Sequence, residues 1–175
     1  MRVVEHRRHS LRQPSDPHLS REGVALARRL GATIGRFDRV VTSPKTRAVE
    51  TAEALGFSVD ETLNELAEMP DEVEPRLEAM ELRSYADYVR AIERSRAMSR
   101  YAHRRAELMR EELEHVPSGG RLLVISHAGV VEFSAAAARP KDAVSWGAPA
   151  GILEGARLSW ERGKWVRGEV LRVPK

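Results

Sequence analysis

The segment Arg121–Ser126, with the sequence RLLVIS, restricts the fold more than any other feature, because it is the clearest buried strand in the chain. His127 follows it directly, and small and apolar residues with helical propensity continue to Ala138. A buried strand that leads through a short polar turn into a helix is typical of parallel sheets in α/β proteins. A histidine at such a junction is costly to bury unless it is hydrogen-bonded or used.

Two earlier segments of the chain have the same strand–turn–helix pattern. A first strand is predicted over residues 2–7 and leads to Arg8 and His9. A second strand is predicted over residues 38–42 and leads to Ser43. This alternation predicts an α/β fold, a three-layer α/β/α sandwich with a central, mainly parallel sheet.

Capping residues, glycines and prolines mark the other predicted boundaries. The predicted elements are a helix from an N-cap at Ser20 to Ile34, ended by Gly35; a helix from an N-cap at Ser43, with Pro44 as its first residue, to Leu55 before Gly56; a mostly irregular stretch over 57–83; one or two helices over 85–116; a helix over 127–138; and a hairpin over 152–172 with its turn at 161–164.

The composition fits one domain, which is expected to span residues 1–175, with 42% hydrophobic residues to form its core. The chain has no cysteine, which excludes thiol nucleophiles, disulfides and thiolate metal sites. Its first residues lack the apolar stretch of a secretory signal, and no apolar run reaches the ~20 residues of a membrane helix. We therefore expect a cytoplasmic protein without a membrane partner.

The positive charge of the chain comes mainly from arginine, since lysine occurs only at Lys45, Lys141, Lys164 and Lys175. Acidic and basic residues alternate along the predicted helices, and the net charge is only +3. Mixed signs favour solvated helix faces over a nucleic-acid surface. Aromatic residues make up 5% of the chain, too few for interleaved base stacking. No nucleic-acid partner is expected.

The three strand ends predict a phosphate pocket. Ligands of such sheets bind at the carboxyl ends of the strands, where Arg8, His9 and His127 follow two of the predicted strands. Arg47 lies near the start of the helix that follows the strand predicted over residues 38–42. Helix N-termini favour anions, and arginine forks suit phosphate oxygens. A phosphate dianion is therefore the expected ligand of this pocket.

Histidine can act as a nucleophile in phosphoryl transfer, and His9 beside Arg8 is the candidate. His127 is expected to donate hydrogen bonds to the phosphoryl oxygens. A leaving alkoxide needs a proton, for which Glu65 is the first choice and Glu68 the second, with Asp71 and Glu72 left open. No cluster of ligands for a metal is visible, and no cofactor is expected.

Four ordered motifs resemble the histidine phosphatase superfamily, which contains the cofactor-dependent phosphoglycerate mutases and related small phosphatases. They are Arg8-His9-Ser10 for the family's Arg-His-Gly; Leu19-Ser20-Arg21-Glu22-Gly23 for Leu-Thr-x-x-Gly; Ser43, Pro44, Arg47, Ala48, Thr51 and Ala52 for Ser-Pro-x-x-Arg-Ala-x-x-Thr-Ala; and Ser126-His127-Ala128-Gly129 for the second histidine. The C-terminal hairpin is similar to the family's closing strands.

The resemblance implies a phosphoglycerate mutase-like fold and a phosphorylated histidine at His9. It implies that Arg8, Arg47 and His127 complete the phosphate pocket and that Glu65 is the acid. The chain departs from the pattern in three ways. Ser10 replaces the usual glycine and would add a hydroxyl donor for the phosphate, the family's Trp-Glu-Gly signature is absent, and the first strand is more polar.

The leading hypothesis is a metal-independent phosphatase that hydrolyses phosphomonoesters through a phosphohistidine at His9. Its substrate would be a small phosphorylated metabolite or a phosphoprotein, and phosphohistidine is a further option because that leaving group needs less protonation. There are two alternatives, a mutase and a non-catalytic phosphate-binding protein. The segment between Phe57 and Tyr85 is short for a substrate lid, which disfavours a mutase. The oligomeric state is left open.

Overall fold

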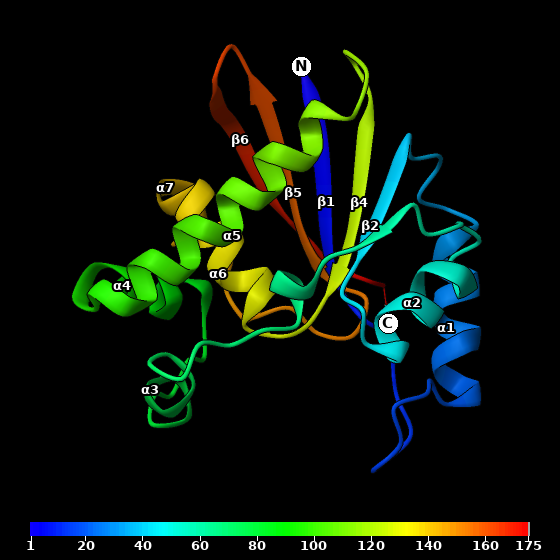
Figure 1. The fold of residues 1–175 in the computed structure, drawn as a ribbon, viewed down its shortest axis with the longest axis horizontal. Helices are drawn as coiled ribbons and strands as arrows, with labels where there is room; N and C mark the ends of the chain where they lie inside the picture. The colour runs from blue at the N-terminus through cyan, green and yellow to red at the C-terminus, as the bar shows by residue number, and fades with distance from the viewer. Residues whose placement is uncertain (175) are drawn as a thin grey trace.

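The computed structural model describes residues 1–174, which form one continuous six-stranded sheet flanked by helices (Figure 1). The strands are β1 (Arg2–Arg8), β2 (Arg39–Thr42), β3 (Glu61–Thr62), β4 (Arg121–Ser126), β5 (Gly155–Glu161) and β6 (Lys164–Leu171). Their order in the sheet is β3-β2-β4-β1-β5-β6. The first four are parallel to one another, β5 pairs antiparallel with β1, and β6 pairs antiparallel with β5. The predicted mainly parallel sheet is confirmed.

The helices are α1 (Arg21–Gly31), α2 (Thr46–Ala54), α3 (Glu74–Glu78), α4 (Tyr85–Arg94), α5 (Arg96–Glu114), α6 (Val130–Ala138) and α7 (Pro140–Ala143), with a 3-10 turn η1 (Asn64–Leu66). Figure 1 shows α1 and α2 together on one side of the sheet and α4 to α7 on the other. None of the helices in residues 1–174 combines the length and apolarity required to cross a membrane.

The apolar residues of β4 divide the core into two layers. Leu122 and Val124 belong to the cluster that packs against α5, whereas Leu123 and Ile125 pack against α1 and α2. Successive strand residues point to opposite faces of the sheet. A strand with four consecutive apolar residues, as in β4, must therefore be covered on both faces. The three-layer α/β/α sandwich is confirmed.

Helix α1 begins as predicted and ends earlier than predicted. The Ser20 side chain caps it by accepting a hydrogen bond from the backbone N–H of Gly23 at 3.0 Å. The helix ends at Gly31, not at Ile34, and this glycine packs directly against the end of α2. A Cβ there would lie 2.1 Å from the carbonyl oxygen of Leu55. The prediction that Gly35 ends the helix was therefore wrong by one turn.

The stretch from Tyr85 forms two helices, and one residue separates them. The backbone N–H of Ser95 donates to Ala91 at the end of α4, while its side chain accepts from Met98 in the first turn of α5. The predicted C-terminal hairpin is also confirmed. Its turn places Arg162 at φ 50° and Gly163 at φ 78°, the conformation that a tight two-residue hairpin requires.

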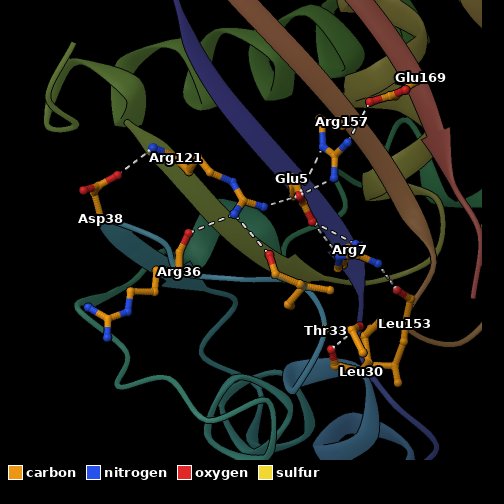
Figure 2. Close-up of polar contacts among 11 residues, drawn as sticks. Glu5, Arg7, Leu30, Thr33, Arg36, Asp38, Arg121, Leu153, Arg157 and Glu169 are labelled. Carbon is orange, nitrogen blue, oxygen red and sulfur yellow. Dashed lines mark hydrogen bonds and ion pairs between the residues drawn. The ribbon is translucent and has the colours of Figure 1, made fainter. Parts of the chain in front are cut away.

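Strand β1 is central although Glu5, His6 and Arg7 are polar, because each of them has partners across the sheet. On one face, Glu5 accepts hydrogen bonds from Arg7, Arg121 and Arg157 (Figure 2). On the other face, the His6 ring lies between two serine hydroxyls, 2.6 Å from Ser126 and 2.8 Å from Ser134. Buried polar groups that are fully hydrogen-bonded can occupy a core position.

Candidate active site

Strands β1, β4 and β2 are neighbours, so their carboxyl ends lie side by side at one edge of the sheet. Hydrogen bonds extend the ladder just past the strand ends. The His9 N–H donates to the Ser126 carbonyl at 2.9 Å, and the Ser43 N–H donates to the Ile125 carbonyl at 2.9 Å. The structure thus brings together the three junctions that the sequence marked.

The His9 ring is held in one tautomer. Its Nδ1 lies 2.7 Å from the carbonyl oxygen of Ser10, a contact that requires a proton on Nδ1. The opposite nitrogen, Nε2, accepts a hydrogen bond from the Nε of Arg47 at 3.2 Å. Both contacts agree that Nε2 carries the lone pair, which is the form that can attack phosphorus.

The surroundings of His9 keep its ring neutral. The residue is only 7% exposed. Burial, and after it the positive charges of Arg47, Arg8 and Arg12, lower the pKa of His9 to about 4, although the hydrogen bond to Ser10 acts in the opposite direction. At neutral pH the lone pair on Nε2 is therefore available without prior loss of a proton.

His127 lies against His9, with the two ring centroids 5.3 Å apart. Its Nε2 is 2.7 Å from the hydroxyl of Ser43, and its buried Nδ1 has no hydrogen-bond partner among residues 1–174. Burial, followed by the charge of Arg47, lowers the pKa of His127 to about 3. A bound phosphate would raise this pKa and turn the ring into a donor.

Arg8 and Arg47 form no ion pair with a carboxylate in the part of the chain that the structure describes. Arg8 donates from one terminal nitrogen to the Ala150 carbonyl at 3.2 Å, and its buried Nε has no partner among these residues. Arg12 and Lys45 are exposed, and their positive charges act on the histidine rings. Unpaired cations of this kind attract a dianion.

The hydroxyl of Ser10 is already occupied in the structure. It donates to the Gly23 carbonyl at 2.7 Å, while the Ser10 N–H donates to the hydroxyl of Thr51 at 2.9 Å. These bonds attach the turn after β1 to the first turn of α1 and to the middle of α2. The Ser10 hydroxyl thus has a partner within the fold, and its donor role toward phosphate stays a prediction.

Glu65, the first candidate for the acid, is bound to α5. Both of its carboxylate oxygens accept hydrogen bonds from Arg104, at 2.7 and 2.8 Å, and Arg105 lies 3.5 Å away. The hydrogen bonds from Arg104 lower the pKa of Glu65, so its carboxyl group is ionised at neutral pH. Glu68 is exposed, and its backbone carbonyl accepts a hydrogen bond from Arg105. Among residues 1–174, the side chain of neither glutamate is hydrogen-bonded to His9 or His127.

Ser43 belongs to the site, a role that the sequence did not predict for it. The predicted helix with Ser43 as N-cap and Pro44 as first residue begins instead at Thr46. The Ser43 hydroxyl contacts His127 and accepts from the Lys45 N–H at 3.2 Å, which stabilises the turn ahead of the helix, while Lys45 itself takes the N-cap position. The predicted convergence of the three strand ends is the signal that would have placed Ser43 near His127, and the pairing of β2 with β4 provides that contact.

The second histidine turn also differs from prediction. Helix α6 begins at Val130, not at His127, because Gly129 adopts φ 84° and the side chain of Glu132 accepts from its N–H at 2.7 Å. A glycine adopts this left-handed conformation at little cost. The three residues of the turn therefore hold the His127 ring at the strand end, ahead of the helix.

No group of three or more histidine, aspartate or glutamate side chains in residues 1–174 is arranged to hold a metal ion. The positive groups at this edge of the sheet are side chains, above all Arg8 and Arg47. They can neutralise phosphate oxygens by bidentate hydrogen bonds.

A family model, described as histidine phosphatase superfamily (branch 1), matches residues 3–166. Comparison with curated proteins gave no significant match. Among solved structures, the chain is similar to phosphoserine phosphatase from Entamoeba histolytica in complex with 3-phosphoglyceric acid. The TM-score is 0.70 at 14% identity, over 99% of this chain and 98% of that one.

Two further solved structures are similar over almost the whole length of both chains. A mycobacterial glucosyl-3-phosphoglycerate phosphatase, complexed with VO3, gives a TM-score of 0.67 at 18% identity over 98% of each chain. The Bacillus stearothermophilus protein YhfR gives 0.62 at 18% identity over 95% of each chain. At these identities the likeness shows the fold, and the family model shows the family.

Proposed function

The chain belongs to the histidine phosphatase superfamily (branch 1), and we propose that it is a phosphatase that works through a phosphohistidine at His9 without a metal. One observation carries the proposal. The Nε2 of His9, fixed by the Ser10 and Arg47 contacts as the nitrogen with the lone pair, is contacted by Arg47, and the positive charge of Arg8 also acts on the ring; neither arginine has a carboxylate partner among residues 1–174.

In the proposed first step, Nε2 of His9 attacks phosphorus, an N–P bond forms and the P–O bond to the leaving group breaks. Water then attacks the phosphohistidine, the N–P bond breaks, and orthophosphate leaves with the ring restored. Arg8 and Arg47 would neutralise the equatorial oxygens, and His127 would donate to them once the bound dianion has raised its pKa. The low pKa of His9 keeps the nucleophile unprotonated.

A small phosphorylated metabolite is the substrate class best supported. Two of the structural neighbours are named as phosphatases of phosphoserine and of glucosyl-3-phosphoglycerate, both small phosphorylated molecules. Glu65 is retained as the proposed acid for alkyl esters. It would first have to leave its ion pairs with Arg104 and Arg105.

Those ion pairs favour a second candidate, a phosphatase of phosphohistidine or another phosphoramidate. A glutamate held by two arginines is a poor proton donor at neutral pH. An imidazole leaving group carries or acquires its own proton near neutral pH, so no carboxylic acid is required. This candidate uses the same nucleophile and the same phosphate pocket.

The main proposal is tested by hydrolysis of an aryl phosphate in EDTA, with wild type and His9→Ala side by side and vanadate as inhibitor. We expect turnover that EDTA leaves unchanged, that vanadate inhibits and that His9→Ala lowers by at least ~10⁴-fold. Activity lost in EDTA and restored by a divalent metal, or retained in His9→Ala, would contradict the mechanism.

The two substrate classes are separated with Glu65→Gln, measured on an alkyl phosphate and on phosphoramidate. If Glu65 is the acid, the variant loses about 10²–10⁴-fold on the alkyl ester and little on phosphoramidate. If the second candidate holds, wild type prefers phosphoramidate and the substitution changes neither rate by more than a few-fold. Glu61→Gln, an exposed glutamate paired with Arg39, is the matched control.

A further inference from the structure

Glu132 is a fully buried glutamate that the phosphate pocket does not use. It lies in the first turn of α6, and each of its carboxylate oxygens accepts a hydrogen bond from a different backbone segment. One oxygen accepts from the N–H of Gly129 at 2.7 Å, and the other accepts from the N–H of Ala150 at 2.8 Å. The carboxylate therefore bridges two loops that are far apart in sequence.

Both loops lead directly to proposed catalytic groups. Gly129 ends the short turn that holds His127 at the end of β4. Ala150, whose N–H binds Glu132, also accepts the hydrogen bond from Arg8 on its carbonyl oxygen, at 3.2 Å. A continuous path thus runs from the His127 turn through Glu132 and the backbone of Ala150 to the Arg8 guanidinium.

Helix capping alone does not account for Glu132. The contact with Gly129 would satisfy a cap, but the second oxygen reaches a loop outside the helix. Burial raises the pKa of Glu132, although backbone hydrogen bonds and the positive charge of Arg8 act in the opposite direction. The neighbouring hydroxyls of Tyr85 and Tyr101 are buried without partners among residues 1–174. A carboxyl group in such surroundings is held at a cost that its two backbone contacts and the charge of Arg8 offset.

We propose that Glu132 is a positioning residue for the phosphate pocket, which acts through Ala150 to orient Arg8 and through Gly129 to fix the His127 turn. The inference rests on the proposed function, because it assigns a role toward a phosphate bound at that site. A guanidinium must meet the phosphate oxygens within a narrow angle, so a small shift of the Ala150 carbonyl changes how well Arg8 binds them.

The test is a double-mutant cycle with Glu132→Gln and Arg8→Met. The glutamine has one acceptor oxygen, so one of the two backbone N–H groups loses its partner while the side-chain volume is kept. Aryl phosphate turnover and the affinity for vanadate are measured for wild type, both single variants and the double variant. We expect Glu132→Gln to lower kcat/KM and vanadate affinity by about 10- to 100-fold in wild type. In the Arg8→Met background it should lower them by less than about twofold, because Arg8 is no longer there to be oriented.

Glu112→Gln is the matched control. Glu112 is also a buried glutamate, but it pairs with Arg39 at the amino end of β2, away from the pocket. We expect this variant to lose stability while kcat/KM and vanadate affinity stay within about twofold of wild type. Equal losses from Glu132→Gln in both backgrounds, or a loss of the same size in Glu112→Gln, would overturn the positioning role and leave a structural one.

A second measurement covers the case in which Glu132→Gln does not fold. The backbone amide signals of Gly129 and Ala150 are followed by NMR during vanadate titration of wild type and Arg8→Met. We expect both signals to shift in wild type and the Ala150 shift to be lost in Arg8→Met. Unchanged Ala150 signals in a wild type that binds vanadate would overturn the inference alone. A wild type that neither binds vanadate nor turns over would overturn the proposed function and the inference with it.

Discussion

Arg7 and Arg8 are adjacent in β1, yet their surroundings are opposite. Arg7 is buried and donates twice to Glu5, at 2.8 and 3.0 Å, and once to the Leu153 carbonyl (Figure 2). Arg8 points to the other side, toward the strand end, and forms no ion pair among residues 1–174. Because strand residues alternate in direction, one step along the chain separates a structural arginine from a proposed phosphate ligand.

The difference lies in the carboxylates, not in the arginines. On the face shown in Figure 2, Glu5 receives hydrogen bonds from Arg7, Arg121 and Arg157, and Glu169 pairs with the outer side of Arg157 at 2.8 Å. Burial alone would raise the pKa of Glu5, but the three guanidiniums more than offset it, and this pKa is lowered. A cluster of arginines that already holds carboxylates has little attraction left for an anion. The edge with Arg8 and Arg47 keeps its positive charge for a ligand.

The largest effect should come from removing the carboxylate at the centre of the structural cluster. Glu5→Gln leaves three arginines without their buried partner, so we expect the free energy of unfolding to fall by about 3–5 kcal/mol. The kcat/KM of the folded protein should stay within about threefold of wild type. Denaturant unfolding and aryl phosphate turnover measure the two effects.

Glu169→Gln is the control for that variant, because Glu169 lies at the partly exposed end of the same cluster. Its expected cost is below ~1 kcal/mol. A Glu5→Gln protein of normal stability, or one whose turnover falls in proportion to its loss of stability, would show that the two regions are not separate as described.

The neighbouring arginines give the sharpest form of the comparison. Methionine keeps the apolar stem of arginine, so Arg7→Met and Arg8→Met remove the charged ends at two successive positions. Arg8→Met should lower kcat/KM by about 10²–10³-fold and change stability little. Arg7→Met should lose at least ~1 kcal/mol of stability and keep its turnover within a few-fold. The interpretation fails if the two variants exchange these effects.

The smallest effect concerns pH, through the buried His6 of β1. Burial lowers the pKa of His6 to about 3, whereas the unfolded chain titrates near ~6.5. Below pH ~6.5 the unfolded state binds the proton and the folded state does not, so stability falls as the pH decreases toward 3. One such group contributes a slope of up to ~1.4 kcal/mol per pH unit, and His9 and His127 act in the same direction.

His6→Asn removes this titration while it keeps a donor and an acceptor between Ser126 and Ser134. The free energy of unfolding, measured from pH 7 to pH 4, should then decline less steeply by the contribution of about one proton. An unchanged slope would mean that His6 is not held neutral by the core.

The fold and the core of the site could be predicted from local patterns. The apolar strand Arg121–Ser126 and the polar residues at three strand ends determine the parallel sheet and the edge at which His9, Arg47 and His127 meet. These signals are local because they depend on residues that are adjacent in sequence. The conserved geometry of parallel sheets then brings the strand ends together.

The rest depends on contacts between distant residues, which no local pattern reports. The polar character of β1 is explained by Arg121 and Arg157, which are 116 and 152 residues from Glu5. The ionised state of Glu65 depends on Arg104, and the place of Ser43 in the site depends on its contact with His127. These pairs of residues are far apart in sequence, so only the folded structure identifies them as partners.

The proposed phosphohistidine at His9 can be trapped and identified. Wild type and His9→Ala are mixed with an aryl phosphate in EDTA, quenched in alkali during turnover and analysed by peptide mass spectrometry. We expect a phosphoryl group on His9 in the wild type and none in the variant, which should also be inactive. A phosphoryl group on another residue, or turnover by His9→Ala, would contradict it.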